Sequence, residues 1–215
     1  MKFKYSIIVL SVVSLVGLYG ISLLSQPSRI SLSAVPVYDG QTVIVHGVVT
    51  EYRTTTYGSQ LITIRDTQNN TEPVTLYVEG ALFVEYGDLV EAIGTVQQYK
   101  EQWEVVVNNP RFITVLQKWS NMSFPLWQLA QHPERYQDTN LNVTGIASEP
   151  HDSSMFLSDL DGTYSVTVLY DSSCPHQFSK GDTVMVKARF LYDEKKLQFI
   201  LKATEESHGI WKVER

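Results

Sequence analysis

Histidine and cysteine, the residues most often used for catalysis and metal binding, are few and scattered in this chain. The five histidines show no zinc-binding spacing such as His-x-Glu or His-Glu-x-x-His, and no phosphate-binding loop or Gly-x-Ser-x-Gly turn is present. Cys174 is the only cysteine, so no internal disulfide can form, and Cys174 with His176 offers only two metal ligands. We therefore expect a protein that acts by binding and is not an enzyme, without a metal or cofactor.

Two segments share one pattern, a Gly-Asp pair followed by a strand that ends in tyrosine. The first reads GDLVEAIGTVQQY (87–99) and the second reads GDTVMVKARFLY (181–192). Small or apolar residues stand at positions 3, 5, 7 and 9 after each glycine, which is the period of a strand with one buried face. In both copies the smallest of these residues stands at position 7, Gly94 in the first and Ala188 in the second. A strand that coils or passes close to another backbone needs a small residue at such a place.

The pattern belongs to an internal repeat of about 95 residues. Each copy contains five segments of strand composition separated by turn residues. In the first copy, expected at residues 35–115, the segments are 42–52, 60–66, 72–80, 87–99 and 101–107. In the second, expected at residues 123–215, they are 139–149, 155–162, 163–171, 181–192 and 196–203. The sequence predicts an all-β protein of two domains, with linkers at 26–34 and 116–122.

Helical structure is expected at two kinds of place only. A helical turn fits between the third and fourth strands of a repeat, and a short helix should begin near Pro125 and end at Pro133.

Two further pairs of residues occupy corresponding positions in the two copies. Asp66 matches Asp159, and Tyr77 matches Tyr170.

Residues 7–24 form an uncharged apolar segment long enough to span a bilayer as a helix. Lys2 and Lys4 precede it, which favours a cytoplasmic N-terminus. We expect residues 1–25 to be a single-pass anchor in the cell membrane, with a cleaved signal peptide as the alternative. Both interpretations place residues 26–215 on the extracytoplasmic side. Three Asn-x-Ser/Thr sequons fit an exported chain, and they begin at Asn69, Asn121 and Asn142.

The order of strands, with a glycine in strand one and a Gly-Asp entry to strand four, resembles the oligonucleotide/oligosaccharide-binding (OB) fold. More narrowly, the segments TVIVHGVVTEY, QLITIRDTQ, VTLYVEG and YGDLVEAIGTVQQY resemble the tRNA-anticodon-binding-like and replication protein A-like OB domains. This resemblance covers most of residues 35–203 and implies two five-stranded Greek-key barrels in tandem. The second copy departs from the family pattern at Ala188, where the first has Gly94.

The resemblance also implies a ligand groove across strands two and three, bounded by the loops that join strands one to two and four to five. The family's default ligand is single-stranded nucleic acid. At those places this chain has aromatic side chains, which can stack on bases or sugars, and cations, which can pair with phosphates. The candidate ligand-binding residues are Tyr52, Arg53, Tyr57, Arg65, Tyr77, Tyr99, Lys100, Trp103, Tyr170 and Arg189.

The charge balance keeps a second class of ligand open. The net charge of the chain is −6, and residues 30–115 hold four basic residues against ten acidic ones, whereas a groove that follows a phosphate backbone needs clustered Lys and Arg. The alternative is an extracytoplasmic adaptor that binds proteins or glycans at the cell envelope. The partners to test are therefore the membrane, through residues 7–24, single-stranded nucleic acid and envelope proteins.

One more segment resembles a different family. LAQHPERY (129–136) is similar to the His-x-x-x-Tyr segment of the haem chaperone of cytochrome c maturation, which is also a membrane-anchored OB barrel. Carried over, His132 would attach haem and Tyr136 would lie beside it. In that family the motif closely follows strand five and leads into a tail, whereas here it precedes a second barrel. A haem chaperone is therefore the less favoured alternative.

Overall fold

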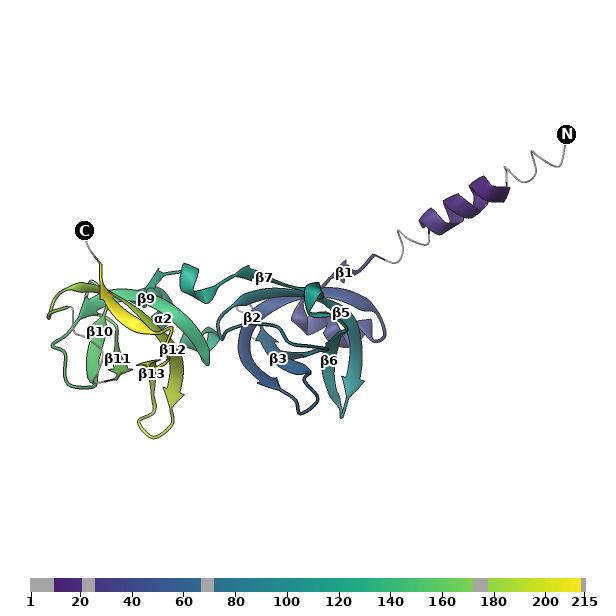
Figure 1. Ribbon diagram of the computed structural model, residues 1–215. Helices are drawn as coiled ribbons and strands as arrows, with labels where there is room; N and C mark the ends of the chain where they lie inside the picture. Colours follow the sequence, from purple (N-terminus) through teal and green to yellow (C-terminus); the bar gives the residue numbers. More distant parts are fainter. Residues whose placement is uncertain (1–9, 21–25, 67–71, 172–177, 214–215) are drawn as a thin grey trace.

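The computed structural model describes residues 10–20, 26–66, 72–171 and 178–213, and its main feature is a pair of β-barrels in tandem (Figure 1). Asn69, Cys174 and His176 lie outside the described residues. The five strands of the first barrel are β2 (Thr42–Thr54), β3 (Gln60–Arg65), β4 (Val74–Val78), β5 (Leu89–Tyr99) and β6 (Gln102–Val107). Those of the second are β9 (Thr139–Ala147), β10 (Ser154–Ser158), β11 (Ser165–Tyr170), β12 (Thr183–Asp193) and β13 (Gln198–Ala203).

Both barrels close in the same strand order. In the first, β2 pairs with β3, β3 with β4, β4 with β6, β6 with β5, and β5 returns to β2. In the second, β9, β10, β11, β13 and β12 follow the same path. The third and fifth strands are parallel in each barrel, and the other pairs of the ring are antiparallel. This order is that of the OB fold, so the expected architecture of two five-stranded barrels is confirmed.

The alternating residues form two separate cores. In β5, Val90, Ala92 and Val96 are buried, and in β12, Val184, Val186 and Phe190 are buried. Ala188, the departure from the family pattern, is fully buried and pairs with Leu141 of β9, so its methyl group fits a closed barrel. The period-2 pattern read from the sequence is therefore the packing pattern of both barrels.

The helical segments precede the barrels, and the expected turn between strands three and four is wrong for the first barrel. Residues 79–88, all of which the structure describes, contain no helix. Instead, the 3-10 segment η1 (Leu32–Tyr38) packs Leu32 and Val35 into the first core. In the second barrel, helix α2 (Leu126–Gln131) contributes Leu126 and Leu129 to the core, so the short helix expected between Pro125 and Pro133 is confirmed.

Each sheet has two strands beyond the barrel that sequence reasoning did not find. The first of them, β1 (Ser28–Arg29) in one repeat and β8 (Phe124–Pro125) in the other, pairs parallel with β2 and β9. Strand β7 (Ile113–Gln117) pairs antiparallel with β5, and β14 (Gly209–Lys212) pairs antiparallel with β12. After β7 the chain continues through η3 (Trp119–Asn121), β8, α2 and η4 (Pro133–Arg135) into the second barrel. Residues 116–122, expected to be a linker, thus hold the end of β7 and all of η3.

The Gly-Asp pair has the same structural role in both copies. Asp88 accepts a hydrogen bond from the backbone N–H of Glu85 at 3.0 Å, and Asp182 accepts one from Ser179 at 2.8 Å. Each carboxylate also binds the lysine that stands thirty residues later, and the Lys118 and Lys212 nitrogens lie 2.8 Å from their aspartates. The aspartate of each Gly-Asp pair therefore links the turn before strand four to the end of strand β7 or β14.

The surroundings of the two ion pairs differ. Asp88 is fully buried and also accepts the backbone N–H of Trp119 at 3.2 Å, whereas Asp182 lies at the surface. Burial alone would lower the pKa of Lys118, but the hydrogen bonds and charges of Asp88 and Glu85 outweigh it and raise that pKa. The hydrogen bond from Lys212, with that from Ser179, lowers the pKa of Asp182.

The Lys118→Met variant is expected to destabilise the first barrel by about 2 kcal/mol, because it leaves the buried Asp88 carboxylate without its cation. The matched Lys212→Met variant should change stability too little to resolve, because water screens the exposed pair. The free energy of unfolding from urea titrations of both variants checks this. Equal losses in the two variants would contradict the assigned role of burial.

The part of the N-terminal segment that the structure describes, residues 10–20, is helical and lies apart from both barrels (Figure 1). Its apolar side chains are exposed, including Leu10, Leu15 and Leu18. Among the described residues, no helix is both long enough and apolar enough to cross a membrane.

Candidate ligand-binding groove of the first barrel

A groove of about 680 Å³ crosses the outer surface of β4, β5 and β6, next to the ends of β2 and β3. We call it the first-barrel groove. Along each of these strands, side chains that point outward alternate with side chains that point into the core. Outward residues of neighbouring strands therefore lie side by side and together form the surface of the groove. The groove is lined by Arg53, Thr55, Leu61, Thr75, Tyr77, Glu79, Gln97, Tyr99, Lys100, Gln102, Trp103, Glu104 and Val106.

Three aromatic rings line the first-barrel groove, each held in a different way. Tyr77 projects from β4, and its hydroxyl lies 3.0 Å from the Ser59 hydroxyl of the β2–β3 loop. Tyr99 is 56% exposed, so one face of its ring is open to a ligand. Trp103 packs against the first core and reaches the rim. A ring that is anchored and partly open can stack on a base or sugar with little loss of side-chain entropy.

The tight turn between β5 and β6 positions the cation at one end of the groove. Lys100 and Glu101 both have positive φ, 47° and 69°, which is the conformation of a two-residue type I′ hairpin. This turn places the Lys100 nitrogen 5.2 Å from the centre of the Tyr99 ring. Arg53, near the end of β2, supplies the second cation of the groove.

Two carboxylates balance these cations. Glu79 follows β4, and Glu104 lies on β6 where it pairs with Gln97 of β5 and Thr75 of β4. The Gln97 side-chain amide donates a hydrogen bond of 2.6 Å to Glu104 Oε1. The groove thus combines aromatic faces, two cations, two acids and amides. It can stack planar groups and form hydrogen bonds, but it is not a purely cationic channel.

Five of the ten predicted ligand-binding residues come together in this groove: Arg53, Tyr77, Tyr99, Lys100 and Trp103. Three more belong to the same barrel but lie elsewhere. Tyr52 packs against Tyr86, with ring centres 4.9 Å apart, and Tyr57 is almost fully exposed in the β2–β3 loop. Arg65 ends β3, four residues beyond Leu61 of the groove.

The prediction for Tyr170 is wrong, because this residue belongs to the second core. It is 3% exposed, and its hydroxyl lies 2.6 Å from the His151 carbonyl oxygen. The parallel register explains the error. Val106 of β6 and Lys202 of β13 are equivalent, because each stands four residues after the first residue of its strand. Val106 lies beside Tyr77, whereas Lys202 lies beside Leu169. Tyr170 is shifted by one residue relative to Tyr77, and in a strand a shift of one reverses the face.

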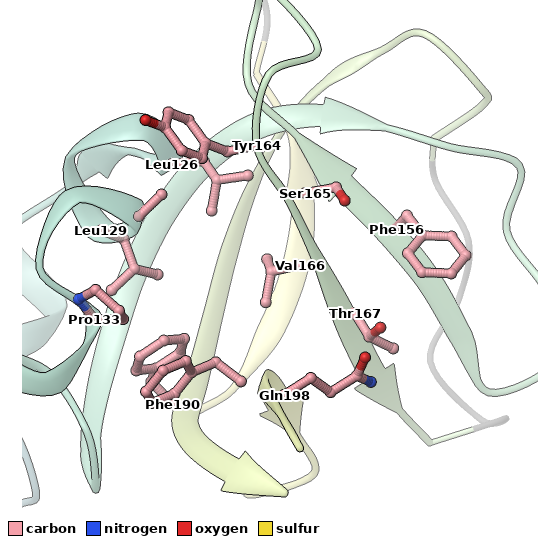
Figure 2. A pocket seen from close by; sticks show the side chains of 12 residues that line it. Leu126, Leu129, Pro133, Phe156, Tyr164, Ser165, Val166, Thr167, Phe190 and Gln198 are labelled. Atoms are coloured by element: carbon pink, nitrogen blue, oxygen red, sulfur yellow. The ribbon is translucent and has the colours of Figure 1, made fainter. Parts of the chain in front are cut away.

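The second barrel has a groove of its own, which contains none of the ten predicted ligand-binding residues. It measures about 280 Å³ and lies between α2 and the strands β10, β11 and β13 (Figure 2). Figure 2 shows Leu126, Leu129 and Pro133 on one side and Phe156, Thr167 and Gln198 on the other. None of the described residues that line it is charged. A repeated pair, Gln102-Trp103 and Gln198-Phe199 at the start of the fifth strand, is the sequence signal that could have located it.

Arg189 lies in a contact between the two barrels and faces neither groove. Its guanidinium stacks 3.7 Å from the centre of the Tyr86 ring of the first barrel. Close by, Trp119 of η3 is buried and meets the ring of His208 edge-on at 5.9 Å. We call Tyr86, Gly87, Trp119, Arg189 and His208 the inter-barrel contact. Arg189 thus lies apart from the five groove residues, and its role in ligand binding stays a prediction.

His208 is a half-buried titratable residue of the inter-barrel contact. Burial lowers the pKa of its imidazole, and the opposing charge of Glu205 compensates only in part. The Glu205 backbone N–H donates to Nδ1 at 3.3 Å, which makes Nδ1 an acceptor and keeps the ring neutral. Gly87 completes the contact with a φ of 91°, and a Cβ atom there would lie 2.4 Å from the Asn140 carbonyl oxygen.

Two other sequence features are placed outside the grooves. His132 is exposed, with Nδ1 3.5 Å from a Glu134 oxygen, and Tyr136 packs against Phe124 at 5.3 Å between ring centres. Asn142, which begins a sequon, is only 4% exposed on β9, so the folded barrel does not present it for glycosylation. Asn121, by contrast, is exposed.

No family model matches the chain, and no curated protein matches its sequence. Among solved structures, the chain is similar to a protein of Leishmania major Friedlin described as an aspartyl-tRNA synthetase, with 14% identity and a TM-score of 0.36. That similarity covers 43% of this chain and 21% of the other. The single-stranded DNA-binding protein of Thermus aquaticus has 15% identity and a TM-score of 0.28, over 81% of this chain and 93% of that one.

A murine DNA-binding protein bound to double-stranded DNA is similar at 13% identity and a TM-score of 0.31. The similarity covers 80% of this chain and 97% of the murine chain. The strand order and closure described above remain the basis of the fold assignment.

Proposed function

We propose that this protein binds single-stranded nucleic acid in the first-barrel groove and has no catalytic activity. The observation that supports this most is the convergence of Tyr77, Tyr99 and Trp103 with Arg53 and Lys100 on one open surface. Stacking on such rings accepts any base, and the cations lie where they can meet the phosphates between stacked bases.

The distribution of charge within the barrel supports the same choice. Residues 30–115 contain only four basic residues, and two of them, Arg53 and Lys100, line this groove. The acidic surface elsewhere repels a polyanion and so favours binding at this one place. With two phosphate contacts, the logarithm of the binding constant should fall with the logarithm of salt concentration with a slope of about −1.4.

The Tyr99→Ala variant is expected to weaken binding of a labelled, mixed-sequence single strand about tenfold, because stacking on an aromatic ring contributes about 1–3 kcal/mol per base. Tyr192→Ala is the matched control, because Tyr192 is also a partly exposed strand-end tyrosine but lies in the second barrel. Fluorescence anisotropy at low and physiological salt measures both. Absence of binding by the unaltered protein at low salt would refute the proposal.

A neutral glycan is the second candidate, and the acids and amides of the groove favour it. Glu79, Glu104, Gln97 and Gln102 can hydrogen-bond sugar hydroxyls while the rings stack on sugar faces. Binding of a glycan would not depend on salt, because no counterions are released. Calorimetry with neutral oligosaccharides at two salt concentrations separates the two candidates.

We propose further that residues 7–24 anchor the protein in the cell membrane, with both barrels on the extracytoplasmic side. Support comes from the absence of charge in this segment and from the lysines before it. Cell fractionation of the full chain and of a chain lacking residues 1–25 tests this. A full chain that remains in the soluble fraction would argue against the anchor.

A further inference from the structure

Glu104 is the feature of the first-barrel groove that phosphate binding does not explain. It lies on the outward face of β6, yet its neighbours on β4 and β5 leave it only 8% exposed. Gln97 donates to Oε1, whereas Oε2 accepts no hydrogen bond from another described residue and is not fully buried. This oxygen can therefore accept a hydrogen bond from water or from a ligand in the groove.

A carboxylate at this place repels the phosphates of a nucleic acid and accepts hydrogen bonds from base edges. The bases differ in what they offer. Guanine presents N1–H and the N2 amino group side by side, which together match the two oxygens of a carboxylate. Thymine presents two carbonyl oxygens, which the carboxylate repels, around a single N–H.

The register of the sheet brings a stacking ring next to this carboxylate. Thr75 of β4 lies beside Glu104, and Tyr77 is the next outward residue along β4. Tyr77 and Glu104 are therefore diagonal neighbours on one face of a parallel strand pair, a separation that an aromatic side chain and a base can bridge. A base stacked on Tyr77 can turn its hydrogen-bonding edge along the surface toward Glu104.

We infer that Glu104 selects guanine in the single strand that the first-barrel groove binds, with Gln97 holding the carboxylate in place. This inference rests on the proposed function. It predicts that a strand of ten nucleotides with two central guanines binds about tenfold tighter than ten thymidines, as expected for one good bidentate contact. Replacing the guanines by inosine, which lacks the N2 amino group, should remove much of that preference.

The test uses fluorescence anisotropy with these three strands and two variants, Glu104→Gln and the control Glu149→Gln, an exposed residue of the second barrel. Loss of a negative charge strengthens binding of every strand, so the readout is the ratio of guanine to thymine affinity. Glu104→Gln should reduce that ratio to less than about threefold, because an amide cannot accept two hydrogen bonds from guanine as a carboxylate does. Glu149→Gln should leave it unchanged.

The possible failures are distinguishable. If no strand binds at low salt, the proposed function is wrong and the inference falls with it. If all three strands bind equally and Tyr99→Ala weakens them all, the groove is the binding site but Glu104 does not read the base. The inosine strand needs no variant, so the inference can be refuted on the unaltered protein.

Discussion

Replacing Trp119 with alanine is expected to cost about 3–5 kcal/mol and to separate the unfolding of the two barrels. Trp119 is 3% exposed in η3, its backbone N–H donates to the buried Asp88, and its ring meets His208 of the second repeat. Removing the ring leaves a cavity between the barrels. The stacking of Arg189 on Tyr86 is a contact between the barrels that this variant keeps.

Calorimetry of the unaltered protein and of two variants checks this prediction. Trp127→Ala is the matched control, because Trp127 is 46% exposed on α2 and does not belong to the inter-barrel contact. We expect one broadened or two separate transitions for Trp119→Ala and an unchanged profile for Trp127→Ala. If both variants leave the transition unchanged, the barrels are energetically independent despite their contact.

The second large effect is expected inside the first barrel, at Gly94. A Cβ atom at this position would lie 2.5 Å from the Val106 carbonyl oxygen and 2.6 Å from the Val105 Cγ1 atom. The obstruction is backbone in the middle of the ring, so it cannot be relieved by rotating a side chain. Gly94→Ala should therefore destabilise the first barrel by about 3 kcal/mol.

The second barrel supplies the control for this variant. Ala188 occupies the equivalent position, so Ala188→Gly should cost only about 1 kcal/mol, from backbone entropy and one lost methyl group. Urea titrations followed by tryptophan fluorescence measure both changes. A Gly94→Ala variant as stable as the unaltered protein would show that β5 and β6 can separate enough to admit a methyl group.

The sequence predicted those strands that a pattern within one short segment is enough to reveal. Period-2 alternation and the repeated Gly-Asp pair led to the ten barrel strands, and five groove residues were found because β2, β4, β5 and β6 bring their ends together. Strands β7 and β14 were missed because each is short and has few buried residues, so the alternation is too weak to see.

The features of the site that the sequence did not reveal depend on contacts between segments that are far apart in the chain. Tyr170 was aligned with Tyr77 because the spacing of the two repeats differs by one residue, and only the pairing with β13 reveals which face it occupies. The contact of Arg189 with Tyr86 could not be foreseen, because the two residues are about a hundred positions apart and belong to different barrels. Contacts between domains depend on surfaces that form only after each barrel has folded.

The two Asp–Lys pairs also set how freely each repeat can change over evolutionary time. In the first repeat, loss of Lys118 alone isolates a buried carboxylate, so Asp88 and Lys118 are constrained to be kept or replaced together. In the second, Asp182 and Lys212 meet in water, and either can drift with little consequence. Two copies of one motif thus evolve under different constraints, because the carboxylate of one copy is fully buried and that of the other is not.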